Sequence, residues 1–94
     1  MTIRQPVLNS MKKAGINMEI IQRLSERTDT VTVENRFGGG SCDTHPLLSY
    51  LIDWVYQTSN AYEMGNQSVK ISDFDRIKYF VLEQDSNAYM TCLD

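Results

Sequence analysis

Histidine and cysteine are scarce in this chain of 94 residues, which has one histidine and two cysteines. A closed structural zinc site normally takes four Cys or His ligands, so a carboxylate would have to complete a site here. The two cysteines, Cys42 and Cys92, also fall short of the disulfide framework of a small secreted domain. We therefore expect two reduced thiols, and neither a metal nor any other cofactor.

Long apolar runs are also lacking. No stretch approaches the roughly 20 apolar residues that cross a bilayer, and Arg4, Lys12 and Lys13 fall where a secretory leader would be apolar. These absences predict a cytoplasmic protein without membrane contact. Apolar residues nevertheless make up 41% of the chain, as in folded soluble domains. Because a chain of this length builds one core with little spare volume, we expect residues 1–94 to form a single compact domain.

The N-terminal part has the pattern of a helical hairpin. Apolar residues at helical spacing over residues 4–14 predict a first helix, which Gly15 would end in the left-handed conformation. Asn17 is placed to cap a second helix over about residues 18–26. The apolar residues of this second helix, which we expect to be buried, are Ile20, Ile21 and Leu24.

After Asp29 the pattern changes to that of a strand. Val31 and Val33 alternate with polar residues. Residues 68–71 repeat this alternation, so we expect the two segments to pair as a small ribbon packed on helices. Residues 37–45 contain three successive glycines and predict a loop.

The C-terminal half predicts two further helices. The first follows Pro46 and covers about residues 47–62, and the second begins at Ser72. Within the second, residues 79–82 also fit a buried strand, and the tail over residues 88–93 is apolar enough to dock on the core. The expected class is mainly helical α+β, with an N-terminal helical hairpin, a short two-stranded β ribbon and two further helices.

The helix after Pro46 has an apolar face wider than that of an ordinary surface helix. Such a helix lies at the centre of the core, or it also contacts a partner. Tyrosine and tryptophan are among the side chains that most often anchor protein interfaces. The candidate interface residues are Tyr50, Trp54, Tyr56 and Tyr62.

The two signs of charge are unevenly placed along the chain. Residues 1–27 carry five bases and two acids, a net charge of +3, whereas residues 28–94 carry four bases and ten acids, a net charge of −6. The larger, negative part would attract a basic partner surface and repel nucleic acid.

A DNA-binding alternative rests on the positive N-terminal segment. A helix, a glycine turn and a second helix are the skeleton of a helix-turn-helix motif. Its second helix would present Gln22, Arg23 and Arg27 outward, where they could reach base edges or phosphates. Such a regulator would act as a dimer, because one small module contacts few phosphates.

A small metal or thiol site is a weaker alternative. Cys42, Asp43 and His45 lie within four residues, and Cys92 would join them if the tail folds back. His45 would serve as the base for a Cys42 nucleophile, although it fits better as a helix cap. The glycines before this cluster could hold an anion at a helix N-terminus, but the Lys and Ser/Thr of a P-loop are missing. We expect no catalytic residues and no metal ligands.

These observations favour a non-enzymatic protein-binding module. An acidic chain of this size suits an accessory or inhibitor protein, such as a phage-type inhibitor, that covers a basic surface of its target. Self-association through the aromatic helix is a further expectation.

Overall fold

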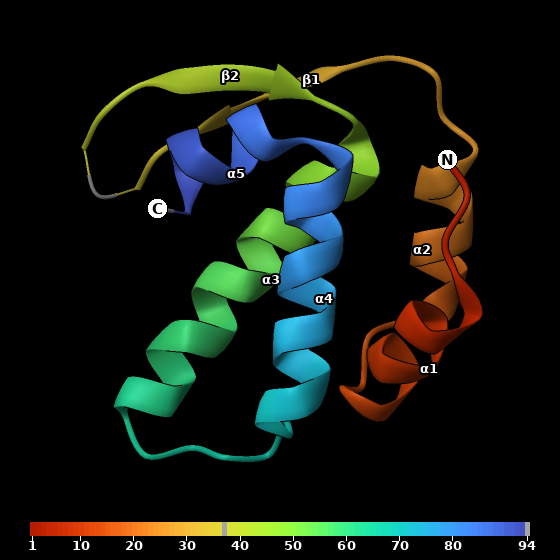
Figure 1. Cartoon of the computed structure of the whole chain (residues 1–94). Helices are drawn as coiled ribbons and strands as arrows, with labels where there is room; N and C mark the ends of the chain where they lie inside the picture. Colours follow the sequence, from red (N-terminus) through yellow and green to blue (C-terminus); the bar gives the residue numbers. More distant parts are fainter. Residues whose placement is uncertain (37, 94) are drawn as a thin grey trace.

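The computed structural model describes residues 1–36 and 38–93 (Figure 1). Within these residues the chain forms five helices and two strands, which confirms the mainly helical α+β class. In chain order they are α1 (Gln5–Lys13), α2 (Met18–Ser25), β1 (Val31–Glu34), β2 (Ser41–Thr44), α3 (Pro46–Glu63), α4 (Ile71–Gln84) and α5 (Ser86–Cys92).

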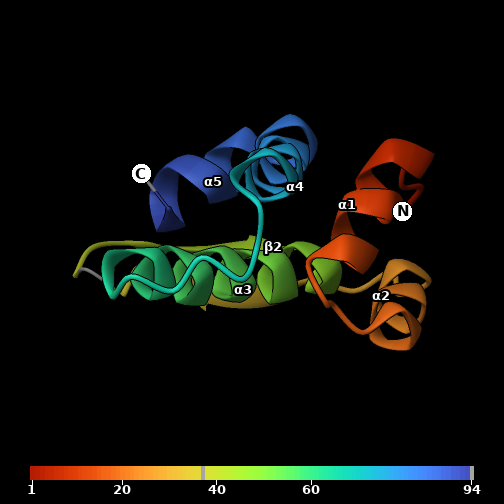
Figure 2. The same ribbon diagram turned by 90° about the horizontal axis from the view of Figure 1, so that it is seen from below.

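The elements surround the side-by-side pair of α3 and α4. The β1–β2 ribbon crosses one end of this pair with α5 packed against it, and α1 lies along α4 (Figure 1). Seen from below, α4 and α5 form one layer and α3 with the ribbon forms the other, while α1 and α2 stand beside both (Figure 2). The end of the pair opposite the ribbon is closed by the connection over residues 64–70 (Figure 1).

The N-terminal hairpin forms as the sequence predicts. Gly15 has a φ of +83°, a conformation that residues with a Cβ rarely adopt. The Asn17 side chain caps α2, because its oxygen accepts from the backbone N–H groups of Glu19 at 3.0 Å and Ile20 at 3.4 Å. Ile21 is buried as expected, but Ile20 is 37% exposed, so the prediction that it is buried is wrong.

The ribbon has a different second strand from the one predicted. β1 pairs antiparallel with β2, whereas residues 68–71 enter α4 and form no strand. The glycine run is the physical reason: Gly38 takes a φ of +81°, and the Asn35 N–H donates to the Gly40 carbonyl at 3.1 Å, so the chain reverses within a few residues. Closing so short a loop costs less entropy than pairing β1 with a segment more than thirty residues away.

The start of α3 is fixed by two residues that the sequence singled out. Pro46 is its first residue, and His45 precedes it as the N-cap. The His45 Nδ1 atom accepts from the Leu47 N–H at 3.0 Å, which confirms the predicted capping role.

The C-terminal segment contains one helix more than predicted. α4 begins at Ile71, one residue before the predicted start, and residues 79–82 continue it as helix. The chain then breaks at Asp85, whose side chain accepts from the Ala88 N–H at 3.1 Å and so caps α5. The predicted docking of the tail is confirmed, because Ala88 and Cys92 are both buried.

The core draws on all five helices and on the turn after α1. Residues of α1, α3 and α4 contribute most of it. The buried cluster is Val7, Met11, Ile16, Ile21, Leu47, Leu48, Leu51, Ile52, Ile77, Phe80, Val81, Ala88 and Cys92.

Candidate functional site

The four aromatic residues predicted as an interface are all half-buried. Tyr50 and Trp54 pack against the core. Tyr56 lies beneath the Arg36 guanidinium, whose carbon is 4.9 Å from the ring centroid, and Arg36 also pairs with Asp53. The predicted interface residues therefore do not form one group. Tyr56 takes part in a local cation–π contact. Trp54 and Tyr62 both contact the ring of Phe74.

Trp54, Tyr62 and Phe74 form a continuous group, which we call the aromatic cluster. The centroid of the Phe74 ring lies 5.2 Å from that of Tyr62 in an edge-to-face arrangement and 5.9 Å from that of Trp54. Both separations fall within the range in which ring pairs attract each other beyond simple burial. The cluster joins the middle and the C-terminal end of α3 to the first turn of α4.

A short hydrogen bond ties this cluster to the connection between the helices. The Tyr62 hydroxyl donates to the Val69 carbonyl at 2.6 Å, which holds the connection against α3. Tyr62 and Val69 both line two surface hollows. The smaller measures about 210 Å³ and reaches Trp54, and the larger measures about 520 Å³ and reaches Phe74.

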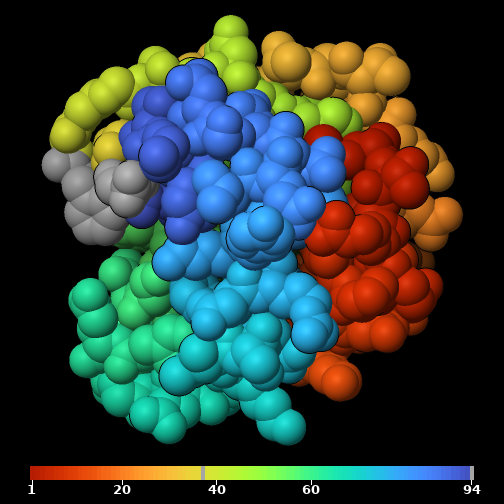
Figure 3. Space-filling model, in the orientation of Figure 1, coloured from red at the N-terminus to blue at the C-terminus, as the bar shows by residue number. Residues whose placement is uncertain are grey.

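The larger hollow is mainly apolar and is open to solvent. Figure 3 shows the end of the molecule to which it belongs, at the bottom of the view. Ile71 is 65% exposed although it lines the hollow, and Met64 on the neighbouring connection is 85% exposed. The residues that line it are Tyr62, Gln67, Val69, Lys70, Ile71, Phe74 and Asp75. The sequence pattern could not show this site, because its lining comes from two helices and the irregular segment between them.

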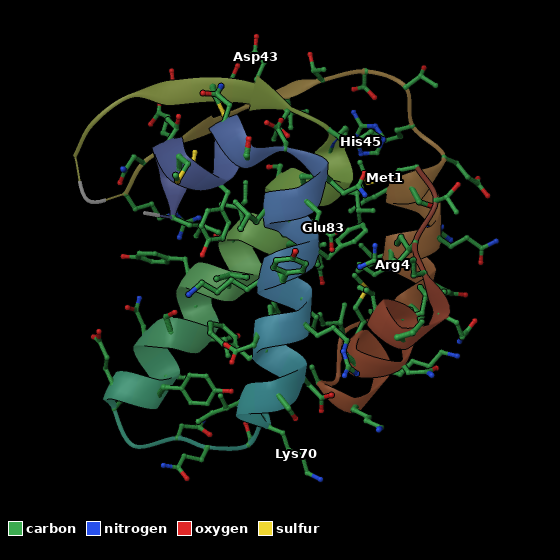
Figure 4. All side chains as sticks on the ribbon, viewed as in Figure 1. Met1, Arg4, Asp43, His45, Lys70 and Glu83 are labelled. Atoms are coloured by element: carbon green, nitrogen blue, oxygen red, sulfur yellow. The ribbon has the colours of Figure 1, made fainter. Side chains whose placement is uncertain are left out.

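The electrostatic environment of the hollow is mixed, with acids close to its phenol group. Burial is the main reason that the pKa of Tyr62 is raised, and the carboxylates of Asp75 and Asp73 raise it further. Lys70 lies at the start of α4, at the lower end of the molecule (Figure 4). The arrangement can hold an apolar side chain against the rings while a neighbouring cation reaches Asp75.

The three candidate DNA-contacting residues, Gln22, Arg23 and Arg27, are exposed on or just after α2. Arg27 is engaged by Asp29, since its Nε atom donates to Asp29 Oδ1 at 2.9 Å, and this bond lowers the pKa of the carboxyl. Gln22 lines a hollow of about 390 Å³ under the N-terminal segment, which is held by a 2.6 Å bond from the Met1 amino group to the Ser25 carbonyl.

A second ion pair neutralises another base of the positive segment over residues 1–27. Arg4 donates to Glu83 on α4 through two bonds of 2.8 and 3.1 Å (Figure 4). The hydrogen bond from Arg4 is the main reason that the pKa of Glu83 is lowered. Two of the five N-terminal bases thus face acids of the negative segment, which weakens the positive surface on which the DNA-binding hypothesis depends.

The structure brings two members of the cysteine and histidine set together and leaves the third apart. The Cys92 Sγ atom lies 3.8 Å from the carbonyl oxygen of Val33, the cross-strand partner of Cys42, so Cys92 packs against the ribbon at the level of Cys42. The His45 ring instead points toward α2, with Nε2 2.8 Å from the Arg27 carbonyl oxygen (Figure 4). Among the residues that the structure describes, no three His, Cys, Asp or Glu side chains converge as metal ligands.

The glycine run does not adjoin the N-terminus of α3, as the anion-binding alternative requires. Gly38, Gly39 and Gly40 belong to the turn of the ribbon, and the four residues of β2 separate them from α3. The first backbone N–H group of α3, that of Leu47, donates to the His45 side chain instead. The run therefore serves chain reversal, not the presentation of a helix N-terminus.

Comparisons with protein-family models, with curated proteins and with solved structures find no match to this chain. Over residues 1–36 and 38–93, no helix combines the length and the apolar character required to span a bilayer.

Proposed function

We propose that this chain is a non-enzymatic module that binds a basic segment of another protein at the larger hollow beside Tyr62. The observation that carries the proposal is the hollow itself, where exposed Ile71 adjoins two aromatic rings and Asp75. Apolar surface that is concave, rimmed by polar groups and left open to solvent is typical of a protein contact site.

The charge of the chain supports a basic partner. Residues 28–94, which supply the whole lining of this hollow, carry a net charge of −6. The carboxylates of Asp75 and Asp73 contribute to the raised pKa of Tyr62, so a cation bound beside this hydroxyl would meet two acids. A partner segment that combines an apolar side chain with lysine or arginine would meet both features, as on the basic surface of a nucleic-acid-binding target that an accessory or inhibitor protein covers.

Selection from a random peptide library on the immobilised full chain tests this proposal. We expect enrichment of peptides that join an aromatic or aliphatic residue to Lys or Arg. Binding of these peptides should weaken about tenfold in Ile71→Ser, since loss of a central apolar contact costs more than about 1 kcal/mol. It should also weaken as the ionic strength rises to about 0.15 M.

Tyr79→Ser is the matched control. Tyr79 is also an exposed apolar residue of α4, but it lies near Arg4, away from the hollow. Peptides that lose affinity for Tyr79→Ser and keep it for Ile71→Ser would overturn the proposal. Light scattering on the unliganded chain gives a second check, because a dimer that Ile71→Ser dissociates would assign the same surface to a second copy.

The helix-turn-helix hypothesis is the second candidate, since Gln22, Arg23 and Arg27 are exposed. If it holds, Arg23→Ala combined with Arg27→Ala reduces retention on duplex DNA at low salt. Unchanged retention in this double variant, or the absence of retention in the parent chain, removes the hypothesis.

A further inference from the structure

The last turn of α5 packs against the β1–β2 ribbon and is hydrogen-bonded to its turn. The Asn35 side chain donates to the Thr91 carbonyl at 2.7 Å, and a Cβ added at Gly40 would lie 3.7 Å from the Thr91 methyl group. The start of α5 is held as well, because the Thr44 hydroxyl donates to Asp85 at 2.8 Å. These contacts, from the turn between the strands and from β2, fix how α5 lies on the ribbon.

Cys92 lies within this contact, opposite the strand position of Cys42. Its Sγ atom is 3.8 Å from the carbonyl oxygen of Val33, and Val33 is the direct cross-strand partner of Cys42. The side chain of Cys42 is half-buried on the inner side of β2, and Cys92 is almost completely buried. Both thiols thus enter the same space between the ribbon and α5.

We propose that Cys42 and Cys92 are a reversible oxidation site that closes into a disulfide between β2 and α5, with a low-molecular-weight disulfide as the oxidant. Disulfides require Cβ atoms about 3.5–4.5 Å apart, and a strand residue that faces the last turn of a packed helix can meet this requirement by side-chain rotation. The inference is independent of the hollow beside Tyr62.

The reaction proceeds as two thiol–disulfide exchanges. The Cys42 thiol loses its proton to solvent and attacks one sulfur of the oxidant, which forms a mixed disulfide and releases one small thiolate. The Cys92 thiol then loses its own proton to solvent, and the resulting thiolate attacks the Cys42 sulfur, forms the protein disulfide and releases the second small thiolate. Both released thiolates take up protons, so the protein loses two hydrogens and one oxidant becomes two thiols.

The environments of the two thiols set this order. Burial, and next the neighbouring Cys42, raise the pKa of Cys92 to about 11, so this thiol stays protonated near neutral pH. Cys42 is the more exposed of the two and meets the oxidant first. Cys92 then acts as the resolving thiol.

Incubation of the full chain with oxidised glutathione, followed by mass spectrometry and non-reducing peptide mapping, tests the proposal. We expect the wild type to lose two hydrogens and to yield a linked peptide pair containing Cys42 and Cys92. In Cys92→Ser, Cys42 should retain one glutathione, because the resolving thiol is missing. In Cys42→Ser, modification of buried Cys92 should be at least about tenfold slower than that of Cys42 in Cys92→Ser.

Three results would overturn the proposal. They are a wild type that keeps glutathione on both cysteines, a wild type linked to a second chain through Cys42, and a wild type that remains fully reduced while Cys92→Ser is modified. Circular dichroism of both variants shows whether they remain folded, and the wild-type mapping stands without them.

Discussion

At the scale of single residues, His45 forms two bonds that connect distant segments. Its Nδ1 atom accepts from the Leu47 N–H, so the ring proton is assigned to Nε2, which donates to the Arg27 carbonyl at 2.8 Å. The residue thus caps α3 and fastens the end of α2 to it. The sequence contains one histidine, and this structural role explains its presence without a catalytic function.

Replacement of His45 separates these two roles. We expect His45→Ala to lower the free energy of unfolding by about 1–2 kcal/mol, since both the cap and the bond to Arg27 are lost. His45→Asn should recover about half of this loss, because asparagine is a good N-cap. Urea denaturation measures both values, and equal losses in the two variants would contradict the capping role.

Cys92 should make the free energy of unfolding of the reduced protein fall as the pH rises through the alkaline range. Its pKa rises from an ordinary value of 9.0 to about 11 in the folded chain, so the folded state keeps a proton that the unfolded chain loses. The stabilisation is complete below pH 9 and is lost as the pH rises toward 11. Reduced wild type should therefore lose roughly 2 kcal/mol more than Cys92→Ala over this range. Identical pH profiles of the two proteins in urea denaturation would count against a buried thiol.

At the scale of elements, the ribbon depends on a turn in which adjacent glycines have different roles. Gly38 has a φ of +81°, whereas a Cβ at Gly39 would meet only the Asn35 side chain, at 3.5 Å. We expect Gly38→Ala to destabilise the fold by about 1–2 kcal/mol, and Gly39→Ala to cost less than about 0.5 kcal/mol. Thermal unfolding compares the two, and equal effects would argue against this register of the ribbon.

The proposed disulfide would join two elements that are far apart in sequence. It closes a loop of about fifty residues, which restricts the unfolded chain more than the folded one. The oxidised protein should be more stable than the reduced protein by about 2–4 kcal/mol in urea denaturation without reductant. Oxidation that lowers stability would show that the native positions of β2 and α5 do not suit the bond.

The elements that the sequence predicts well are those whose ends are determined by nearby capping or helix-ending residues. Gly15, Asn17 and Pro46 each act within a few residues of themselves, so the ends that they determine can be read without tertiary information. The sequence does not predict β2, because Ser41–Thr44 is mostly polar and becomes a strand only by pairing with β1. It does not predict α5 either, because this short helix is also stabilised by the contacts of Asp85 and Thr91 with Thr44 and Asn35. The aromatic cluster likewise needs the packing of α3 on α4.

At the scale of the whole molecule, ion pairs join the positive and negative segments. Arg4 binds Glu83 and Arg27 binds Asp29, and each hydrogen bond lowers the pKa of the acid. An acid with a lowered pKa stabilises the fold above its ordinary pKa and loses this effect as the pH falls. Glu83→Gln should therefore show a smaller loss of stability on acidification than the wild type. An unchanged acid profile in thermal unfolding would indicate that the Arg4 pair is fully screened by solvent.

The proposed binding site lies beside Tyr62 and takes a basic, partly apolar segment. Its most direct test is an amide NMR titration of the full chain with one of the selected peptides. We expect the largest shifts to centre on Tyr62, Val69, Ile71 and Asp75. Ile71→Ser should weaken peptide binding about tenfold, and Tyr79→Ser should leave it unchanged. Shifts confined to the N-terminal hairpin or the ribbon would contradict it.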